Sequence, residues 1–219
     1  MASKRDGGAT IHRILISHFP VLVEALGQVY NSGRQSVLRR GREDVSLVLD
    51  GHALDVISHS AEQTRRLGMH LGRLVRAGDV ICLHGELGVG KTCLVQGIGR
   101  GMGIEVPINS PSFILVNEYA PPGSRLRLYH IDLYRLDKAV PEALAIGLDE
   151  YLYGAGVCVI EWADRAAEIM PADHLTVELR WIDYYKRGLV FRAAGVRSNE
   201  LLAAFREQVY GQRREPAGA

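Results

Sequence analysis

The spacing of apolar residues predicts alternating strands and helices from residue 54 onward. Short apolar or β-branched runs between glycine, proline and polar residues are typical of strands, and apolar residues three or four positions apart are typical of helices. Strands are predicted at Leu54–Ser58, Asp79–His84, Phe113–Tyr119, Arg125–Leu136, Gly156–Trp162, His174–Trp181 and Leu189–Ala193. Helices are predicted after Ser60, at Thr92–Met102, from Pro141 to about Tyr151, and at Leu201–Val209. This order indicates an α/β sandwich with a mainly parallel central sheet and antiparallel marginal strands.

Local signals predict where several elements begin and end. Ser60, with Gln63 three residues later, is typical of a capping box at a helix start, and Gly78 suits the C-terminal stop of that helix. Residues 120–124, Ala-Pro-Pro-Gly-Ser, predict a five-residue loop joining two strands as a hairpin.

The first 52 residues differ from the rest of the chain. Asn31–Asp44 is polar and basic with two glycines, which is typical of a flexible linker. We therefore expect a partly flexible N-terminal extension at 1–52, a nucleotide-binding domain at 53–196, and a C-terminal helix with a disordered tail at 197–219. The extension could be an amphipathic helix, a partner-binding arm, or sequence gained through an early assigned start.

Composition and charge narrow the function classes. An apolar fraction of 47% suits a globular core, and the formal net charge is only +1. Residues 1–52 hold 7 Lys and Arg against 5 Asp and Glu, leaving 19 against 20 in the remainder. Because autonomous nucleic-acid binding needs a basic patch, we expect no binding to DNA and only indirect contact with any RNA.

Cysteine usage and hydropathy predict a cytoplasmic protein. Cys82, Cys93 and Cys158 have no Cys-x-x-Cys spacing, which indicates reduced thiols without zinc or disulfides. The longest apolar stretch, Ile14–Leu26, contains His, Pro and Glu and is too short to span a bilayer. We therefore expect no association with a membrane.

One glycine-rich motif predicts a nucleotide site. The sequence "GELGVGKT" lies between a predicted strand and a predicted helix, the context that a P-loop requires. Its residues are Gly85, Glu86, Leu87, Gly88, Val89, Gly90, Lys91 and Thr92. Glycines let backbone N–H groups turn toward phosphate oxygens, Lys91 can reach the β- and γ-phosphates, and the Thr92 hydroxyl can ligate Mg²⁺. The helix that follows aims its positive dipole end at the same place, although Gly97, Gly99 and Gly101 should weaken it.

Two carboxylates at predicted strand ends are candidates for the chemistry of this site. Asp132 follows an apolar strand expected to end beside the P-loop, and Glu161 ends another apolar run. Asp132 could instead be a helix cap or a surface residue, and Glu161 could simply pair with Arg or Lys. Trp162 is either an aromatic side chain at the edge of the core or a contact for nucleotide or partner.

Together the motifs carry a family resemblance. The segments "GELGVGKT", "NSPSFILVNEY", "LYHIDLYRL" and "VIEWADR" resemble, in order and spacing, the bacterial TsaE family, formerly YjeE, over roughly residues 54–195. The resemblance implies a P-loop NTPase-like fold and a Mg²⁺-dependent ATPase. Such an ATPase acts with TsaB and TsaD proteins in the threonylcarbamoyl modification of the adenosine next to the anticodon of tRNAs.

The resemblance also implies roles for particular residues. The P-loop residues would bind the ATP phosphates, Thr92, Asp132 and Glu161 would hold Mg²⁺, and Lys91 would act in catalysis with the two carboxylates. Thr64 would lie near the nucleotide base. Ser110–Ser112 would be a mobile switch-like segment, with Ser112 replacing the usual threonine, just as Cys93 replaces a common second threonine beside the P-loop. Turnover should be slow without partners.

Other function classes remain possible at this point. A small-molecule kinase would need a lid insertion, and none is obvious between the two carboxylates. A regulatory GTP-binding switch would need N-K-x-D and D-x-x-G motifs, which the chain lacks. A module that binds ATP without turnover would use the same ligands, so the sequence does not exclude it.

Overall fold

The computed structural model describes residues 51–111 and 115–211. The N-terminal extension predicted for 1–52 therefore lies outside the described residues up to position 50. Ser112 of the expected switch-like segment and the expected tail from residue 212 also lie outside them.

Seven strands form one sheet. They are β1 (Ala53–Ser58), β2 (Val80–His84), β3 (Val116–Tyr119), β4 (Leu128–Asp132), β5 (Val157–Glu161), β6 (Leu175–Trp181) and β7 (Arg187–Ala193). Their order in the sheet is β1-β7-β6-β2-β5-β4-β3. β6, β2, β5 and β4 run parallel to one another, whereas β7, β1 and β3 pair antiparallel with their neighbours. The predicted α/β fold with a mainly parallel centre and antiparallel margins is confirmed.

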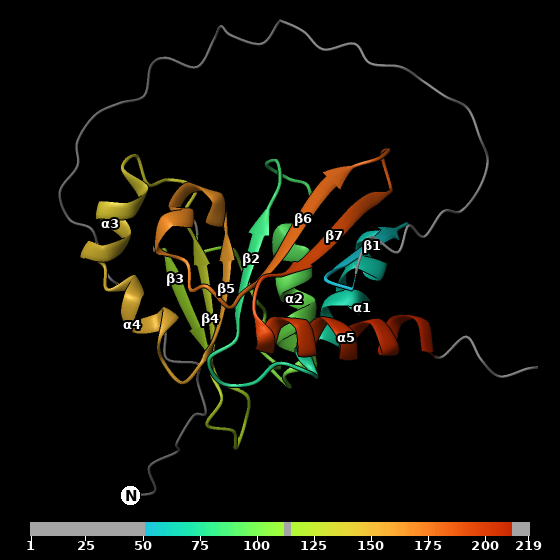
Figure 1. Cartoon of the computed structure of the whole chain (residues 1–219), viewed down its shortest axis with the longest axis horizontal. Coiled ribbons are helices and arrows are strands. Elements are labelled where there is room, and N and C mark those ends of the chain that lie inside the picture. The colour runs from blue at the N-terminus through green and yellow to red at the C-terminus, as the bar shows by residue number, and fades with distance from the viewer. Residues whose placement is uncertain (1–50, 112–114, 212–219) are drawn as a thin grey trace, which may run out of the picture.

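Helices cover both faces of the sheet (Figure 1). They are α1 (Ala61–Gly72), α2 (Lys91–Gly101), α3 (Ala139–Ala145), α4 (Leu148–Leu152), the 3-10 helix η1 (Ala163–Ile169) and α5 (Val196–Tyr210). Alternate residues of a strand point to opposite faces. In β2, Ile81 and Leu83 accordingly pack with α1, α2 and α5, while Val80 and Cys82 pack with α3, α4 and η1.

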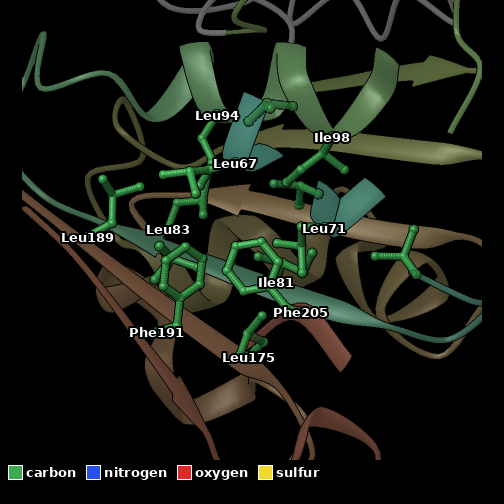
Figure 2. Packing of buried hydrophobic residues seen from close by; sticks show 14 of the residues in the cluster. Leu67, Leu71, Ile81, Leu83, Leu94, Ile98, Leu175, Leu189, Phe191 and Phe205 are labelled. Carbon is green, nitrogen blue, oxygen red and sulfur yellow. The ribbon is translucent and has the colours of Figure 1, made fainter. Parts of the chain in front are cut away.

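The larger of the two cores fills the space between the sheet and α1, α2 and α5. Figure 2 shows side chains from these elements meeting there: Leu67, Leu71, Ile81, Leu83, Leu94, Ile98, Leu175, Leu189, Phe191 and Phe205. The Phe191 and Phe205 ring centroids are 4.8 Å apart, so α5 closes the core against β7. Through this core β2 and α2, which flank the P-loop, are held in a rigid setting.

Glycines bring α1 and α2 into backbone contact. A Cβ atom on Gly68 would lie 2.3 Å from the Leu94 carbonyl oxygen, and one on Gly97 would lie 2.1 Å from the Arg65 carbonyl oxygen. Both distances are too short for any side chain. Of the glycines expected to weaken the P-loop helix, Gly97 and Gly101 thus permit its close packing on α1, whereas Gly99 makes room for the Ile108 side chain.

Several predicted bounds differ from the structure. The first helix ends at Gly72, and Gly78, with φ of 85°, lies in the turn before β2. The helix expected from Pro141 to Tyr151 is two helices, because Gly147 has φ of 73° and interrupts it. The hairpin between β3 and β4 spans residues 120–127 rather than five residues.

The last helix begins at Val196, five residues earlier than predicted. The Asp173 carboxylate accepts hydrogen bonds from the backbone N–H groups of Arg197 at 2.7 Å and Ser198 at 2.9 Å. These bonds satisfy donors that a helix start leaves unpaired. Since Asp173 lies more than twenty positions away in the sequence, no local pattern signals this start.

No helix in the described ranges, 51–111 and 115–211, is long and apolar enough to cross a membrane.

Candidate nucleotide-binding site

The P-loop lies between β2 and α2, so the strand and helix predicted around the motif are both present. Gly85, Gly88 and Gly90 have φ angles of 135°, 75° and 114°, in the region that favours glycine. A Cβ atom on Gly85 would also lie 2.4 Å from the Leu179 carbonyl oxygen. The loop therefore needs glycine at these positions to turn its backbone.

Lys91 is the first residue of α2, at the end of the loop, and is buried, with 4% of its surface exposed. Its Nζ donates hydrogen bonds to the carbonyl oxygens of Gly85 at 2.7 Å and Glu86 at 3.0 Å. The same cation lies 3.9 Å from the centroid of the Trp162 ring. Burial lowers the pKa of the Lys91 ammonium, and the nearby Glu161 carboxylate opposes that effect.

Thr92 and Glu161 are joined directly across the site. The Thr92 hydroxyl donates to Oε1 of Glu161 at 2.7 Å, and Nε2 of His130 lies 2.9 Å from the same oxygen. An ionised carboxylate only accepts hydrogen bonds, so His130 donates. Because the Thr92 hydrogen is used in this bond, the hydroxyl lone pairs are available to a cation.

Asp132 lies one strand farther from the P-loop than the sequence analysis expected. β5 separates β4 from β2, and Glu161 pairs with Leu83 on one side and with Asp132 on the other. The Asp132 carboxylate accepts hydrogen bonds from the Ser110 hydroxyl at 2.8 Å and from the Tyr134 N–H at 3.0 Å. It thereby connects the site to the segment expected to act as a switch.

These side chains share one cavity of about 320 Å³. Its lining consists of Leu87, Gly88, Gly90, Lys91, Thr92, Ser110, Asp132, Tyr134, Glu161 and Trp162. The structure thus brings together the lysine, the hydroxyl and both carboxylates that the sequence analysis selected.

The donor set fits a magnesium ion held jointly with phosphates. Among the described residues, no three His, Cys, Asp or Glu side chains come together as a metal site. Mg²⁺ in nucleotide sites is typically bound by one or two carboxylates plus substrate phosphates, and all its preferred ligands are oxygens. The Thr92 hydroxyl and the carboxylates of Asp132 and Glu161 supply such oxygens beside the P-loop.

Thr64 does not line this cavity. It is 2% exposed, and its hydroxyl lies 2.8 Å from the Ser58 hydroxyl and donates to the Ser60 carbonyl at 3.3 Å. Ser60 caps α1 as predicted, accepting a hydrogen bond from the Gln63 N–H at 3.1 Å. This geometry gives Thr64 a structural contact between β1 and α1.

Sequence reasoning assigned no role to His130. The residue is fully buried and contacts the central carboxylate. A histidine two positions before Asp132, between the apolar Leu128 and Ile131, was the available signal. Trp162 has φ of 60°, unusual for a bulky residue, and its ring lies 5.0 Å from that of Tyr134. Such strain is typical of functional sites and here aims the Trp162 ring at Lys91.

Comparison with known proteins shows which protein family this sequence resembles. The family model "Threonylcarbamoyl adenosine biosynthesis protein TsaE" matches residues 58–188. The tRNA threonylcarbamoyladenosine biosynthesis protein TsaE of Treponema pallidum is 45% identical over 124 residues, covering 57% of this chain and 89% of that protein. The protein of the same name from Bacillus subtilis is 37% identical over 136 residues, covering 62% and 83%.

A solved structure is similar as well. The crystal structure of Bacillus subtilis YdiB matches with a TM-score of 0.62 and 30% sequence identity, covering 72% of this chain and 96% of that chain.

Proposed function

This chain belongs to the TsaE family, and on that premise we propose that it binds and hydrolyses Mg-ATP in the P-loop cavity. We further propose that it does so as a component of the machinery that makes threonylcarbamoyladenosine in tRNA. Relatives at 37–45% identity are named for this biosynthesis. The proposed partners are TsaB and TsaD proteins.

The proposal depends on the grouping of three side chains in one cavity. The Thr92 hydroxyl is 2.7 Å from the Glu161 carboxylate in the cavity that also holds the Lys91 ammonium. A P-loop ATPase needs a lysine for the phosphates and a hydroxyl for the metal at the start of the P-loop helix, together with a carboxylate for the metal from a neighbouring strand end. The site combines these groups within a single cavity.

Different residues of the cavity would bind the phosphates and the metal ion. Backbone N–H groups of the P-loop and the Lys91 ammonium would bind phosphate oxygens, with Lys91 exchanging its carbonyl contacts for them. Thr92, with Asp132 or Glu161, would hold Mg²⁺, which supplies neutralisation of the charge that develops on the phosphates. Glu161 is fixed by two hydrogen bonds and would orient water or the metal.

Asp132→Asn should separate metal binding from nucleotide binding. The change removes one negative charge from the metal site but keeps a side chain that can accept from Ser110. ATP affinity should stay within a few fold, while the Mg²⁺ concentration needed for half-maximal turnover rises about tenfold or more, the loss expected for a weakened charge-assisted contact. Magnesium titrations of phosphate release would measure this. Undiminished turnover with unchanged magnesium dependence would make the carboxylate structural.

Reconstitution of tRNA modification tests the function as a whole. With TsaB, TsaD and the other required substrates present, this protein should support several cycles of modification per complex, with release of inorganic phosphate. Removing this protein, or removing Mg²⁺, should stop the cycles. Transfer of the γ-phosphoryl group to a small molecule, rather than to water, would favour the kinase alternative instead.

A further inference from the structure

Several exposed apolar side chains lie close together in sequence at the turn between β6 and β7. Four of the eleven large apolar side chains exposed in the described part of the chain lie within five consecutive residues. They are Trp181 at 44% exposed, Ile182 at 43%, Tyr184 at 82% and Tyr185 at 71%. We call residues 181–185 the aromatic tip. Exposed apolar groups scattered singly need no explanation, whereas a cluster of them along one turn is typical of an interaction site.

The aromatic tip lies at the same edge of the sheet as the P-loop. β6 runs parallel to β2, so both strands end at this edge, and the β6–β7 turn projects beyond it (Figure 1). None of the four exposed side chains lines the cavity of the proposed ATP site. The patch is therefore a second feature of the edge that carries the nucleotide site.

The backbone of the tip is well ordered by its own hydrogen bonds. The Asp183 carboxylate accepts from the N–H groups of Tyr185 at 2.8 Å and Lys186 at 2.7 Å, and its other oxygen pairs with the Lys186 ammonium at 3.1 Å. These contacts, led by the Lys186 N–H, hold the pKa of Asp183 below its ordinary value. A preorganised turn presents its rings with less entropy left to lose on binding.

Arg187 connects the tip to the P-loop. Its Nε donates to the Val89 carbonyl at 3.0 Å, while Nη1 donates to the carbonyls of Asp183 at 3.0 Å and Lys186 at 2.9 Å. The guanidinium carbon also lies 3.5 Å from the centroid of the Trp181 ring. One side chain thus bonds to the phosphate loop and to the aromatic tip at once, so a shift of the loop backbone would move the tip.

The charges around the tip favour a protein over RNA. Lys186 pairs with Asp183, Arg180 pairs with Asp55 at 3.1 Å, and Arg187 donates to carbonyls. RNA binding draws its affinity from cations available to phosphates, and those nearest the tip already have partners. Tyr and Trp exposed at a rigid turn are instead the residue types enriched in the centres of protein interfaces.

We infer that the aromatic tip is the anchor for a partner protein, which accepts the two tyrosine rings in an apolar pocket, and that Arg187 couples this contact to the P-loop. The inference rests on the proposed function in one respect, because the coupling matters only if nucleotide binds the loop. The probe for the partner is the TsaB–TsaD pair of the same organism.

The double variant Tyr184→Ser, Tyr185→Ser tests the anchor. Both rings are exposed, so the fold should not depend on them. In the presence of Mg-ATP, affinity for the TsaB–TsaD pair should fall about tenfold or more, as for buried aromatic anchors of interfaces. ATP affinity should stay within about twofold. Tyr153→Ser, at a side chain 75% exposed beside α4, is the matched control and should leave both affinities unchanged.

Other results of these binding measurements would contradict the inference or the proposed function. Unchanged affinity of the double variant for the pair, or an equal loss in the control, contradicts the inference. Loss of binding to free tRNA with normal binding to the pair would identify an RNA surface and also overturn it. If the wild-type protein binds ATP but never binds the pair, the anchor is wrong while the nucleotide site stands. A wild-type protein that binds no ATP would instead contradict the proposed function.

Arg187→Lys tests the coupling. Lysine keeps the positive charge but cannot bond to the Val89 carbonyl and to the tip carbonyls in the same way. The ratio of affinities for the TsaB–TsaD pair with and without Mg-ATP should move toward one. A ratio equal to that of the wild-type protein would show that the P-loop and the tip are independent.

Discussion

Replacing Lys91 with alanine should weaken ATP binding about tenfold to a hundredfold and abolish hydrolysis. The magnitude follows from the loss of a charge-assisted hydrogen bond, about 1.5–3 kcal/mol. The ammonium is buried, lies at the first residue of α2, and already bonds to two carbonyls of the loop. No other lysine or arginine lines the cavity, among the residues the structure describes. Removal therefore takes away the cavity's cationic side chain.

Calorimetric titration with Mg-ATP and assays of phosphate release would measure both effects. Arg100→Ala is a matched control, because Arg100 is an exposed cation in the last turn of the same helix. Alanine at 91 leaves the carbonyls of Gly85 and Glu86 without their donor, so thermal unfolding should be recorded for both variants. Unchanged ATP affinity in a folded Lys91→Ala protein would contradict the assignment of the phosphate cradle.

The features that the sequence predicted are those that depend on the local pattern of residues. Apolar runs located the strands, and "GELGVGKT" located the loop because its glycines and Lys91 have mechanical roles at fixed spacing. Asp132 and Glu161 were selected because each comes at the end of an apolar run expected to be a strand, and the strand before Asp132 was expected to end beside the P-loop. The structure brings both into one cavity with Thr92. Their roles as metal ligands stay predictions.

What the sequence did not predict depends on contacts between distant segments. The strand order, with β5 between β2 and β4, makes Glu161 rather than Asp132 the carboxylate on the strand next to the P-loop. The bond from His130 to Glu161 joins residues 31 positions apart, and that from Arg187 to Val89 joins residues 98 positions apart. Spacing along the chain carries no signal for such pairs. The sequence predicted only that glycines weaken α2, because the close approach that Gly97 and Gly101 allow toward α1 is a contact between distant segments.

The near-neutral net charge of the chain beyond residue 52 favours a mechanism that acts through a partner protein. Beyond residue 52 the chain holds 19 basic and 20 acidic residues, so it offers little attraction for an RNA backbone. A protein of this kind can influence tRNA modification through a partner whose affinity depends on the bound nucleotide. The partner must bind one nucleotide state more tightly than another, because a ligand shifts an equilibrium only by its differential affinity.

Glu161→Gln should spare ATP binding and lower turnover about a hundredfold or more. Glutamine keeps an oxygen that can accept from Thr92 and His130, so the hydrogen bonds at 2.7 and 2.9 Å can persist. It removes the negative charge that would orient water or the metal, a role of the kind that contributes about 10²–10⁴ in rate. Glu161→Ala should do more harm, because it also leaves the buried His130 ring and the half-buried Thr92 hydroxyl without their acceptor.

Reconstituted tRNA modification over several cycles distinguishes a protein that uses ATP hydrolysis from one that only binds ATP. If turnover resets or powers the complex, Glu161→Gln should bind the TsaB–TsaD pair in the presence of ATP yet fail to sustain repeated modification. Glu150→Gln, at an exposed glutamate of α4, is the matched control and should behave as the wild-type protein does. Normal repeated modification by Glu161→Gln, together with association that ignores the nucleotide, would favour a module that binds ATP without using its hydrolysis. The charge of Glu161 would then serve the structure of the site rather than the reaction.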